Sequence, residues 1–168
     1  MAIVASDVKK YLSGGAGNSN PAASLGGVIS STEVVDNTLN NLFALAPASE
    51  ADAGSIKYRG FFIKNTHATL TYKSVVIYIS SNTPSGSTEV KIGLALEDGS
   101  PMDTIANEDT APDPAVTFST ADGIGNALSI GDIAPGASKG IWVKWDITAG
   151  AAAVNDAVTV AIKGETEA

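Results

Sequence analysis

Apolar and polar side chains alternate with a period of two over much of the chain after residue 54. Apolar residues recur at every second position in residues 90–96 and 141–147, and Val75, Ile77 and Ile79 alternate with Val76 and Tyr78 in residues 75–79. This spacing is typical of β-strands that bury one face. Weaker stretches of the same kind lie at residues 56–63, 115–118, 127–130 and 158–162. The pattern therefore predicts about seven strands.

Turn-forming residues separate these stretches, most clearly at residues 81–86 and 133–138. About seven short strands with intervening turns favour an all-β fold, an immunoglobulin-like β-sandwich. Packing one apolar face of each sheet against the other predicts a shared core. We expect that core to contain Ile77, Ile79, Ile92, Leu94, Val143, Trp145, Val158 and Val160.

The first 53 residues lack this alternation and are rich in glycine and other turn formers between residues 13 and 27. Leu39, Leu42 and Phe43 recur at helical spacing, so a short helix is expected within residues 34–45, limited by Pro47. We therefore divide the chain into an extended amino-terminal arm (1–53) and a β-sandwich domain (54–168). Residues 97–114 have little strand character and are expected to form a long loop.

Composition narrows the possible partners. The formal net charge is −8, which opposes binding to nucleic acid and to anionic lipid. There is no cysteine, so disulfides and thiolate metal sites are excluded. We find neither a secretory signal pattern nor an apolar run long enough to span a bilayer. Synthesis in a cytoplasm, without a nucleic-acid or membrane partner, is the expectation.

The sequence holds no convincing catalytic constellation, so we expect no enzyme and no cofactor. His67 is the single histidine and falls in a predicted turn, where a solvated side chain is the ordinary interpretation. The glycines at residues 123–125 lack the lysine of a phosphate-binding loop.

The loop at residues 97–114 carries several carboxylates, and oxygen-rich loops can bind Ca²⁺. Their spacing does not match an EF-hand, so a solvated acidic loop without a resident metal is the first interpretation. The alternative is a calcium site with the ligands Asp98, Asp103, Glu108 and Asp109.

Trp142 and Trp145 stand three residues apart on one predicted strand, so they point to opposite faces of it. One is expected in the core and the other, Trp142, at an interface. An exposed tryptophan could also stack on a sugar, which leaves a carbohydrate- or surface-binding module as an alternative.

Several stretches of the chain, most of them rich in glycine and turn residues, carry a family resemblance. In the amino-terminal region they are residues 10–16 and 18–27, and further along they are residues 58–59, 64–66, 79–83 and 149–153. In these stretches the chain resembles small structural proteins of tailed bacteriophages and prophages. These are mainly turn and glycine positions, so the resemblance implies a fold and a virion setting without catalytic residues.

The resemblance implies a virion protein, and a capsid decoration or cement subunit suits a compact acidic sandwich with an arm. A tail or baseplate component is the alternative. The implied partners are the major capsid protein or other virion proteins, together with further copies of the chain, for which a trimer is one possibility. We expect the binding anchors to be Leu12, Leu25, Val28, Ile29, Leu42, Phe43 and Trp142.

Overall fold

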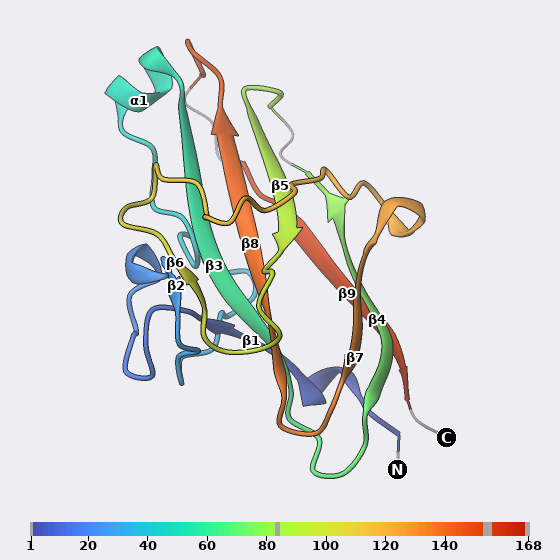
Figure 1. The fold of residues 1–168 in the computed structure, drawn as a ribbon. Coiled ribbons are helices and arrows are strands. Elements are labelled where there is room, and N and C mark those ends of the chain that lie inside the picture. The colour runs from blue at the N-terminus through green and yellow to red at the C-terminus, as the bar shows by residue number, and fades with distance from the viewer. Residues whose placement is uncertain (1, 83–84, 153–155, 167–168) are drawn as a thin grey trace.

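Two antiparallel sheets face each other in the computed structural model, which describes residues 2–82, 85–152 and 156–166 (Figure 1). One sheet has four strands in the order β1-β3-β8-β5, and the other has three in the order β7-β4-β9. A separate pair, β2-β6, lies beside the four-stranded sheet. The strands within the described residues are β1 (Val8–Leu12), β2 (Gly26–Gly27), β3 (Ser55–Asn65), β4 (Tyr72–Ser81), β5 (Thr88–Leu94), β6 (Met102–Thr104), β7 (Leu128–Ile133), β8 (Ser138–Ile147) and β9 (Thr159–Thr166).

The helical parts of the described chain are short. They are the α-helix α1 (Ala48–Ala53) and three 3-10 helices, η1 (Ala5–Asp7), η2 (Pro21–Ala23) and η3 (Ile124–Asn126). The all-β sandwich predicted from the alternation is thus confirmed.

The seven strands of the two larger sheets are joined in an order of their own. Lettered A to G along the chain, they form the sheets A-B-F-D and E-C-G. A constant-type immunoglobulin domain has A-B-E-D and C-F-G. The chain shares the division into four and three strands. Its fifth strand, β7, lies in the three-stranded sheet and its sixth, β8, in the four-stranded sheet, which is the reverse of the immunoglobulin arrangement.

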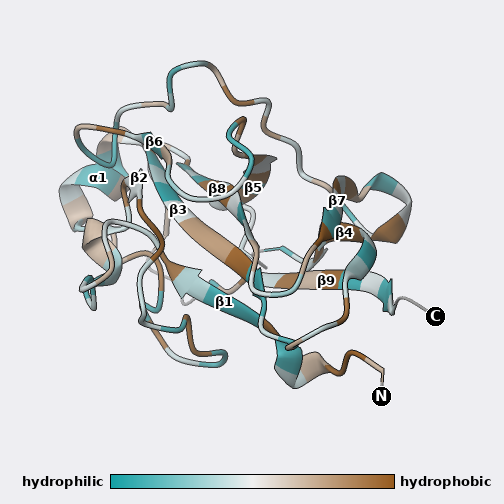
Figure 2. Cartoon of the chain, turned by 60° about the horizontal axis from the view of Figure 1, so that its bottom comes forward, coloured by the Kyte–Doolittle hydropathy of each residue, from teal (hydrophilic) through white to brown (hydrophobic). Residues whose placement is uncertain are grey.

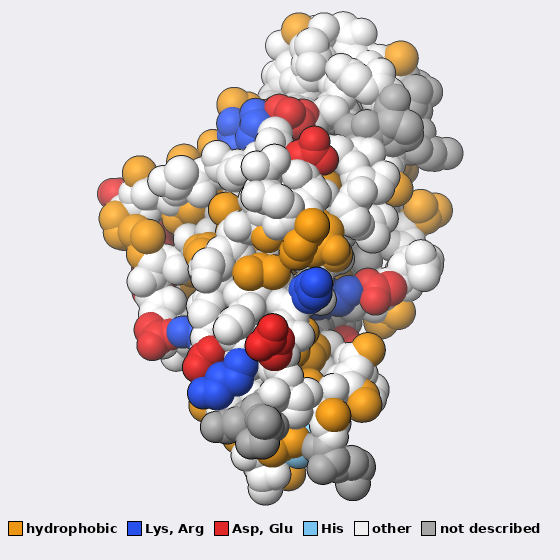
Figure 3. Space-filling view, turned by 90° about the vertical axis from the view of Figure 1, so that its right-hand side faces the viewer, with side chains coloured by type: hydrophobic (Ala, Val, Ile, Leu, Met, Phe, Trp, Pro, Cys, Tyr) orange, Lys and Arg blue, Asp and Glu red, His pale blue; other side chains and the backbone are white. Residues whose placement is uncertain are grey.

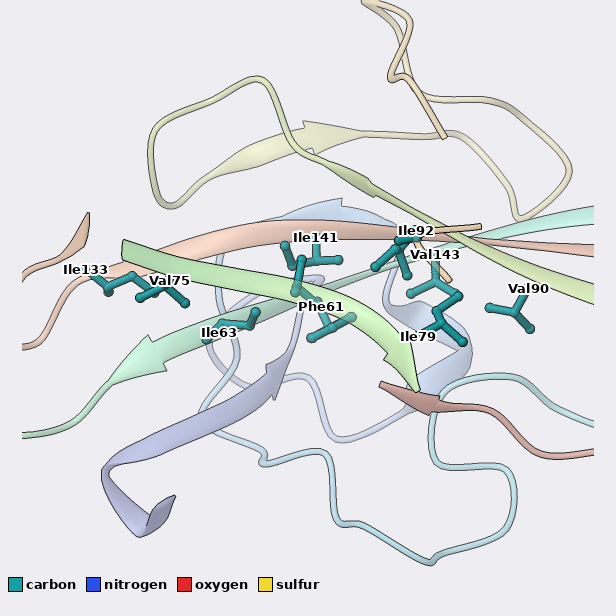
Figure 4. Packing of buried hydrophobic residues seen from close by; sticks show 11 residues of the cluster. Phe61, Ile63, Val75, Ile79, Val90, Ile92, Ile133, Ile141 and Val143 are labelled. Carbon is teal, nitrogen blue, oxygen red and sulfur yellow. The ribbon is translucent and has the colours of Figure 1, made fainter. Parts of the chain in front are cut away.

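The main core lies between the two larger sheets. The side chains labelled in Figure 4 come from both sheets, from β3, β5 and β8 on one side and from β4 and β7 on the other. Ile63, Ile77 and Ile92 are fully buried between them. Four members of the predicted core are buried, and Leu94, Trp145, Val158 and Val160 pack against it half-buried. The hydrophobic middle of β3 is enclosed between β1 and β8, as Figure 2 shows.

A second core covers the opposite face of the four-stranded sheet. Trp142 of β8 and Phe62 of β3 are fully buried there beneath Met102, Ile105 and the half-buried residues Leu25, Ile29, Ala95, Val116 and Phe118. The four-stranded sheet is therefore covered on both faces, and the molecule has three layers.

The amino-terminal region is part of this architecture, which corrects the expectation of a separate arm. Residues of β1 pair with β3 in register from Val8 with Asn65 to Leu12 with Phe61. The next residues fold over the second core, since the backbone N–H of Gly60 donates to the carbonyl of Ser24 at 2.8 Å. The division at residue 53 does not correspond to a boundary in the structure.

The helix expected within residues 34–45 is wrong. That segment consists of turns and irregular backbone, in which Asn37 and Asn40 have positive φ angles of 56° and 57°, a conformation that breaks a right-handed helix. Pro47 precedes α1 as its N-cap instead of ending a helix. Proline is tolerated at this end because the first helical N–H groups need no partner within the helix.

The region between β5 and β7 also differs from the expectation. Residues 97–114 contain β6, which pairs with β2 through Gly26 and Gly27. The strand expected at residues 115–118 is absent from the described structure, and Ser119 forms an isolated bridge with Ile92. The apolar residues Val116 and Phe118 serve the second core from a loop.

Candidate interaction site

Two of the expected binding anchors lie inside the protein. Leu12 is 2% exposed at the end of β1, and Trp142 is fully buried in the second core. The backbone N–H of Leu12 also donates to the carbonyl of Thr32 at 3.0 Å, and the carbonyl of Leu12 accepts the backbone N–H of Ser30 at 2.8 Å. Neither side chain can reach a partner in this fold, so the expectation that they form an interface is wrong.

The anchors at residues 25–29 are divided. Leu25 and Ile29 are half-buried and pack against the second core, whereas Val28 is exposed. Their main role in this structure is to cover the outer face of the four-stranded sheet. Of these three, Val28 alone is exposed, at 46%.

Leu42 and Phe43 face the main core. The Phe43 ring lies 5.3 Å from that of Trp145, centroid to centroid, and the Arg59 guanidinium lies 5.7 Å from the Phe43 ring centroid. A cation over an aromatic face is attracted by the negative charge of that face. These contacts fix residues 42–43 against β3 and β8.

Other apolar residues of the same segment are exposed. Val35 is 60% exposed, Leu39 86% and Leu45 74%. We call residues 35–45 the apolar loop. Its backbone is tied by a hydrogen bond at 2.9 Å from the Asn41 amide to the carbonyl of Val35. The loop is therefore shaped by inward contacts while three aliphatic side chains remain available for binding.

A cluster of buried charges lies near the start of β3. Lys57 and Arg59 are 5% and 2% exposed. Lys57 Nζ is 2.5 Å from Glu50 Oε2 of α1 and 3.0 Å from Glu108 Oε1, and Arg59 also pairs with Glu108. The cluster balances two positive and two negative charges, and it joins α1 and residue 108 to the sheet.

The ionisation of this cluster follows its contacts. Burial disfavours the charge of Lys57, but hydrogen bonds to Glu50 and Glu108 outweigh it and raise the pKa of Lys57. Burial favours neutral Glu108, but its hydrogen bond with Lys57 and the charge of Arg59 outweigh this and lower the pKa of Glu108. Lys57 and Glu108 are therefore both charged at neutral pH, as a buried ion pair requires.

The four carboxylates of the calcium alternative are engaged separately. Asp98 pairs with Lys139, Glu108 with Lys57 and Arg59, and Asp103 Oδ2 accepts the backbone N–H of Asp113 at 3.1 Å. Asp109 is exposed. Within the described residues no group of three acidic or histidine side chains is placed to hold a metal ion. The geometry does not assemble the calcium site.

His67 has a structural role in the turn between β3 and β4. Its Nδ1 accepts the backbone N–H groups of Thr69 and Leu70 at 3.2 and 3.0 Å. The glycine-rich turn at residues 123–125 leads into η3, a 3-10 helix of three residues. Neither feature is arranged for chemistry on a substrate.

The surface offers a shallow depression between the end of β5 and β7. It has a volume of about 170 Å³ and is lined by Leu94, Leu96, Ile130 and the Lys139–Asp98 pair. Its lining includes no hydroxyl or imidazole nucleophile. Of the surfaces described here, the apolar loop is best suited to binding a protein.

The helices in the described part of the chain are too short or too polar to cross a bilayer. Comparison with protein-family models and with curated proteins finds no match for this chain.

Proposed function

We propose that the chain is a structural protein of a bacteriophage virion, a capsid decoration subunit that binds the shell through the apolar loop. The resemblance of its turn and glycine segments to phage structural proteins supports the virion setting. The observation that carries the proposal is the exposure of Val35, Leu39 and Leu45 on a loop held from within by Leu42 and Phe43.

Such a loop is suited to binding because its shape is fixed beforehand. The contacts of Phe43 with Trp145 and Arg59 order the backbone in the free protein, so less conformational entropy is lost on docking. Burial of each exposed leucine contributes about 1.5–3 kcal/mol before the cost of association is subtracted. Repetition of a modest contact over a shell stabilises the lattice through multivalency.

The alternative of a carbohydrate-binding module depends on an exposed tryptophan, and the structure does not provide one within the described residues. Trp142 is fully buried, and Trp145 is half-buried against Phe43. An aromatic platform for a sugar ring needs an exposed face. We therefore keep the protein-binding role.

The double variant L39D/L45D tests the apolar loop. Because a carboxylate resists transfer from water to an apolar interface, we expect at least a tenfold loss of the subunit from particles while the fold is retained. Occupancy is measured by quantitative mass spectrometry of purified particles assembled with each variant. The matched control is I124D, which places a charge at another exposed aliphatic side chain, in η3.

Electron microscopy of particles with and without the gene distinguishes the placements. Loss of regularly spaced density from the capsid supports decoration, and loss confined to the tail supports the tail or baseplate alternative. Unchanged particles would remove the virion proposal itself. Full occupancy of L39D/L45D would reject the loop as the attachment site.

A further inference from the structure

The outer edges of the four-stranded sheet are closed by other parts of the chain. At β1, the N–H of Leu12 donates to Thr32, and the carbonyl of Lys10 accepts from Val34 at 2.8 Å. At β5, the side-chain amide of Asn82 bonds both the N–H and the carbonyl of Val90, at 3.1 and 2.9 Å. These contacts occupy the groups that an added strand would need.

The edge strand β7 of the three-stranded sheet is interrupted. Gly131 has a φ of 83°, and the pairing with β4 shifts register on both sides of Val75, opposite this glycine. Bulges of this kind twist an edge and break its regular row of donors and acceptors. β7 therefore offers a poor template for another strand.

The other edge of that sheet, β9, remains regular. No residue from Thr159 to Thr166 has a positive φ, and the extra residues at its register shifts belong to β4, at residues 74–75 and 80. Its sequence contains no proline. Within the described residues no backbone group outside β4 is hydrogen-bonded to the main chain of β9, and the Thr159 carbonyl accepts the hydroxyl of Ser80, itself in β4, at 3.1 Å.

Apolar side chains at this edge are incompletely covered. Val160 and Ile162 pair with the buried Ile79 and Ile77 and pack against the main core, yet both are only half-buried. Figure 3 views the side of the molecule where β4 and β9 lie, and hydrophobic side chains gather near its middle beside charged ones. A further strand along β9 would cover part of this apolar surface.

We propose that β9 is a self-association edge, at which β9 of a second copy adds antiparallel to form one six-stranded sheet across the pair. Two identical edges joined in this way are related by a two-fold axis, and the contact closes on itself. Main-chain hydrogen bonds supply the attraction, as in other strand additions. This pairing is separate from the apolar loop and does not rest on the virion proposal.

Side-chain pattern and charge select the register. The apolar faces of both copies must lie on the same side of the joined sheet. One residue of β9 therefore pairs with the same residue of the second copy, and the two-fold axis lies between them. With the axis at Ile162, residues 159–165 of one copy pair with residues 165–159 of the other. Ile162 then lies opposite Ile162 of the second copy, and Lys163 lies opposite Ala161 of the second copy. An axis at Lys163 would oppose two ammonium groups, and one at Gly164 would pair only residues 162–166.

The variant A161K tests the register. It places an ammonium group opposite Lys163 of the partner copy twice in each dimer, while its own position on the half-exposed outer face can accept a long side chain. We expect the dissociation constant of the dimer to rise roughly tenfold or more. The double variant A161K/K163E restores opposite charges at both positions and should recover the dimer.

Sedimentation velocity of the full chain from about 1 μM to about 1 mM measures the association. The control S129K adds the same charge to the exposed outer face of β7 and should leave the dissociation constant unchanged. Hydrogen exchange of the wild-type chain gives a second readout, since amides of β9 should become more protected as concentration rises.

A wild-type chain that stays monomeric throughout this range overturns the proposal. So does a dimer that A161K leaves unaffected, or a larger assembly, because an antiparallel edge pairing stops at two copies. If A161K fails to fold, judged by circular dichroism, the concentration dependence of exchange at β9 decides, and unchanged protection there rejects the edge.

Discussion

Trp142 is accommodated by glycines on both neighbouring strands. It pairs with Gly60 of β3 and Gly93 of β5, so a glycine lies on each side of the largest buried side chain. At Gly93 an added Cβ would be 2.5 Å from Val116 Cγ1 and 2.8 Å from the carbonyl of Thr117. The covering loop can approach the sheet closely because these positions lack side chains.

We predict that Gly93→Ala destabilises the fold by about 1–3 kcal/mol, because overpacking forces the loop at residues 116–117 outward. Urea denaturation followed by circular dichroism measures the change. Gly125→Ala is the control, since no atom lies within 4 Å of its added Cβ, and it should be close to neutral. Equal stability of the two variants would contradict close packing over Trp142.

Alternation along β8 assigns Trp142 and Trp145 to opposite faces, and the structure agrees. The alternation could not identify which of the two is fully buried, Trp142, and which is half-buried, Trp145. That depends on a second layer built from residues 24–29 and 102–118, which carry no periodic signal of their own. The glycines opposite Trp142 are a local sign of close packing, but their pairing is known only from the register.

At the scale of elements, the charge cluster of Lys57, Arg59, Glu50 and Glu108 connects pieces that are far apart in the sequence. It joins α1 and the loop after β6 to β3. The backbone N–H of Tyr58 also donates to the carbonyl of Glu108 at 2.7 Å, beyond the end of the β1 pairing. Glu108 thus holds the edge of β3 through both its main chain and its side chain.

Acid should weaken this connection. The pKa of Glu108 is lower in the fold than in the unfolded chain, so its contribution is complete above the ordinary value and is lost as pH falls through the lowered one. We predict that Glu108→Gln destabilises the protein at pH 7 by about 1–3 kcal/mol, and that the difference from wild type shrinks between about pH 5 and pH 2.

Urea denaturation across that pH range measures the difference. Asp109→Asn is the control, because this neighbouring carboxylate is exposed and forms no ion pair within the described residues. A difference between Glu108→Gln and wild type that stays constant with pH would show that the ionisation of Glu108 contributes nothing.

Elements with strong alternation were predictable, and the irregular ones were not. The strands around Ile77, Ile92 and Val143 follow from a period of two. The spacing of Leu42 and Phe43 resembles a helix, yet their apolar side chains reach the core from an irregular loop, because burial of a few side chains requires no regular backbone. The asparagines at residues 37 and 40 were the available signal against a helix.

At the scale of the whole molecule, three layers replace the expected arm and independent sandwich. The first 53 residues supply an edge strand, part of the cover over Trp142 and α1. A chain of this size can support such a second core because more of its surface is buried as length increases. The expected boundary failed because composition changes at residue 53 while packing continues across it.

We predict that a chain beginning at Gly54 does not fold cooperatively. It lacks β1 and the residues that cover Trp142 and Phe62, so a large apolar surface of the four-stranded sheet meets water. Limited proteolysis and dye binding to apolar surface measure the loss. Removing only residues 2–4, whose described contacts include one hydrogen bond from Ile3 to Thr166, should leave cooperative unfolding intact. A protease-resistant 54–168 fragment would restore the two-part division.

The two tryptophans of β8 lie on opposite faces of the four-stranded sheet, so each face carries one natural indole fluorophore. Trp142 lies in the second core beneath the cover near Met102, and Trp145 lies against Phe43, next to the apolar loop. With Trp142 replaced, emission from the remaining indole reports on the loop, and with Trp145 replaced it reports on the outer cover. Changes at the loop and changes at the cover can thus be followed separately in one protein, without any attached label.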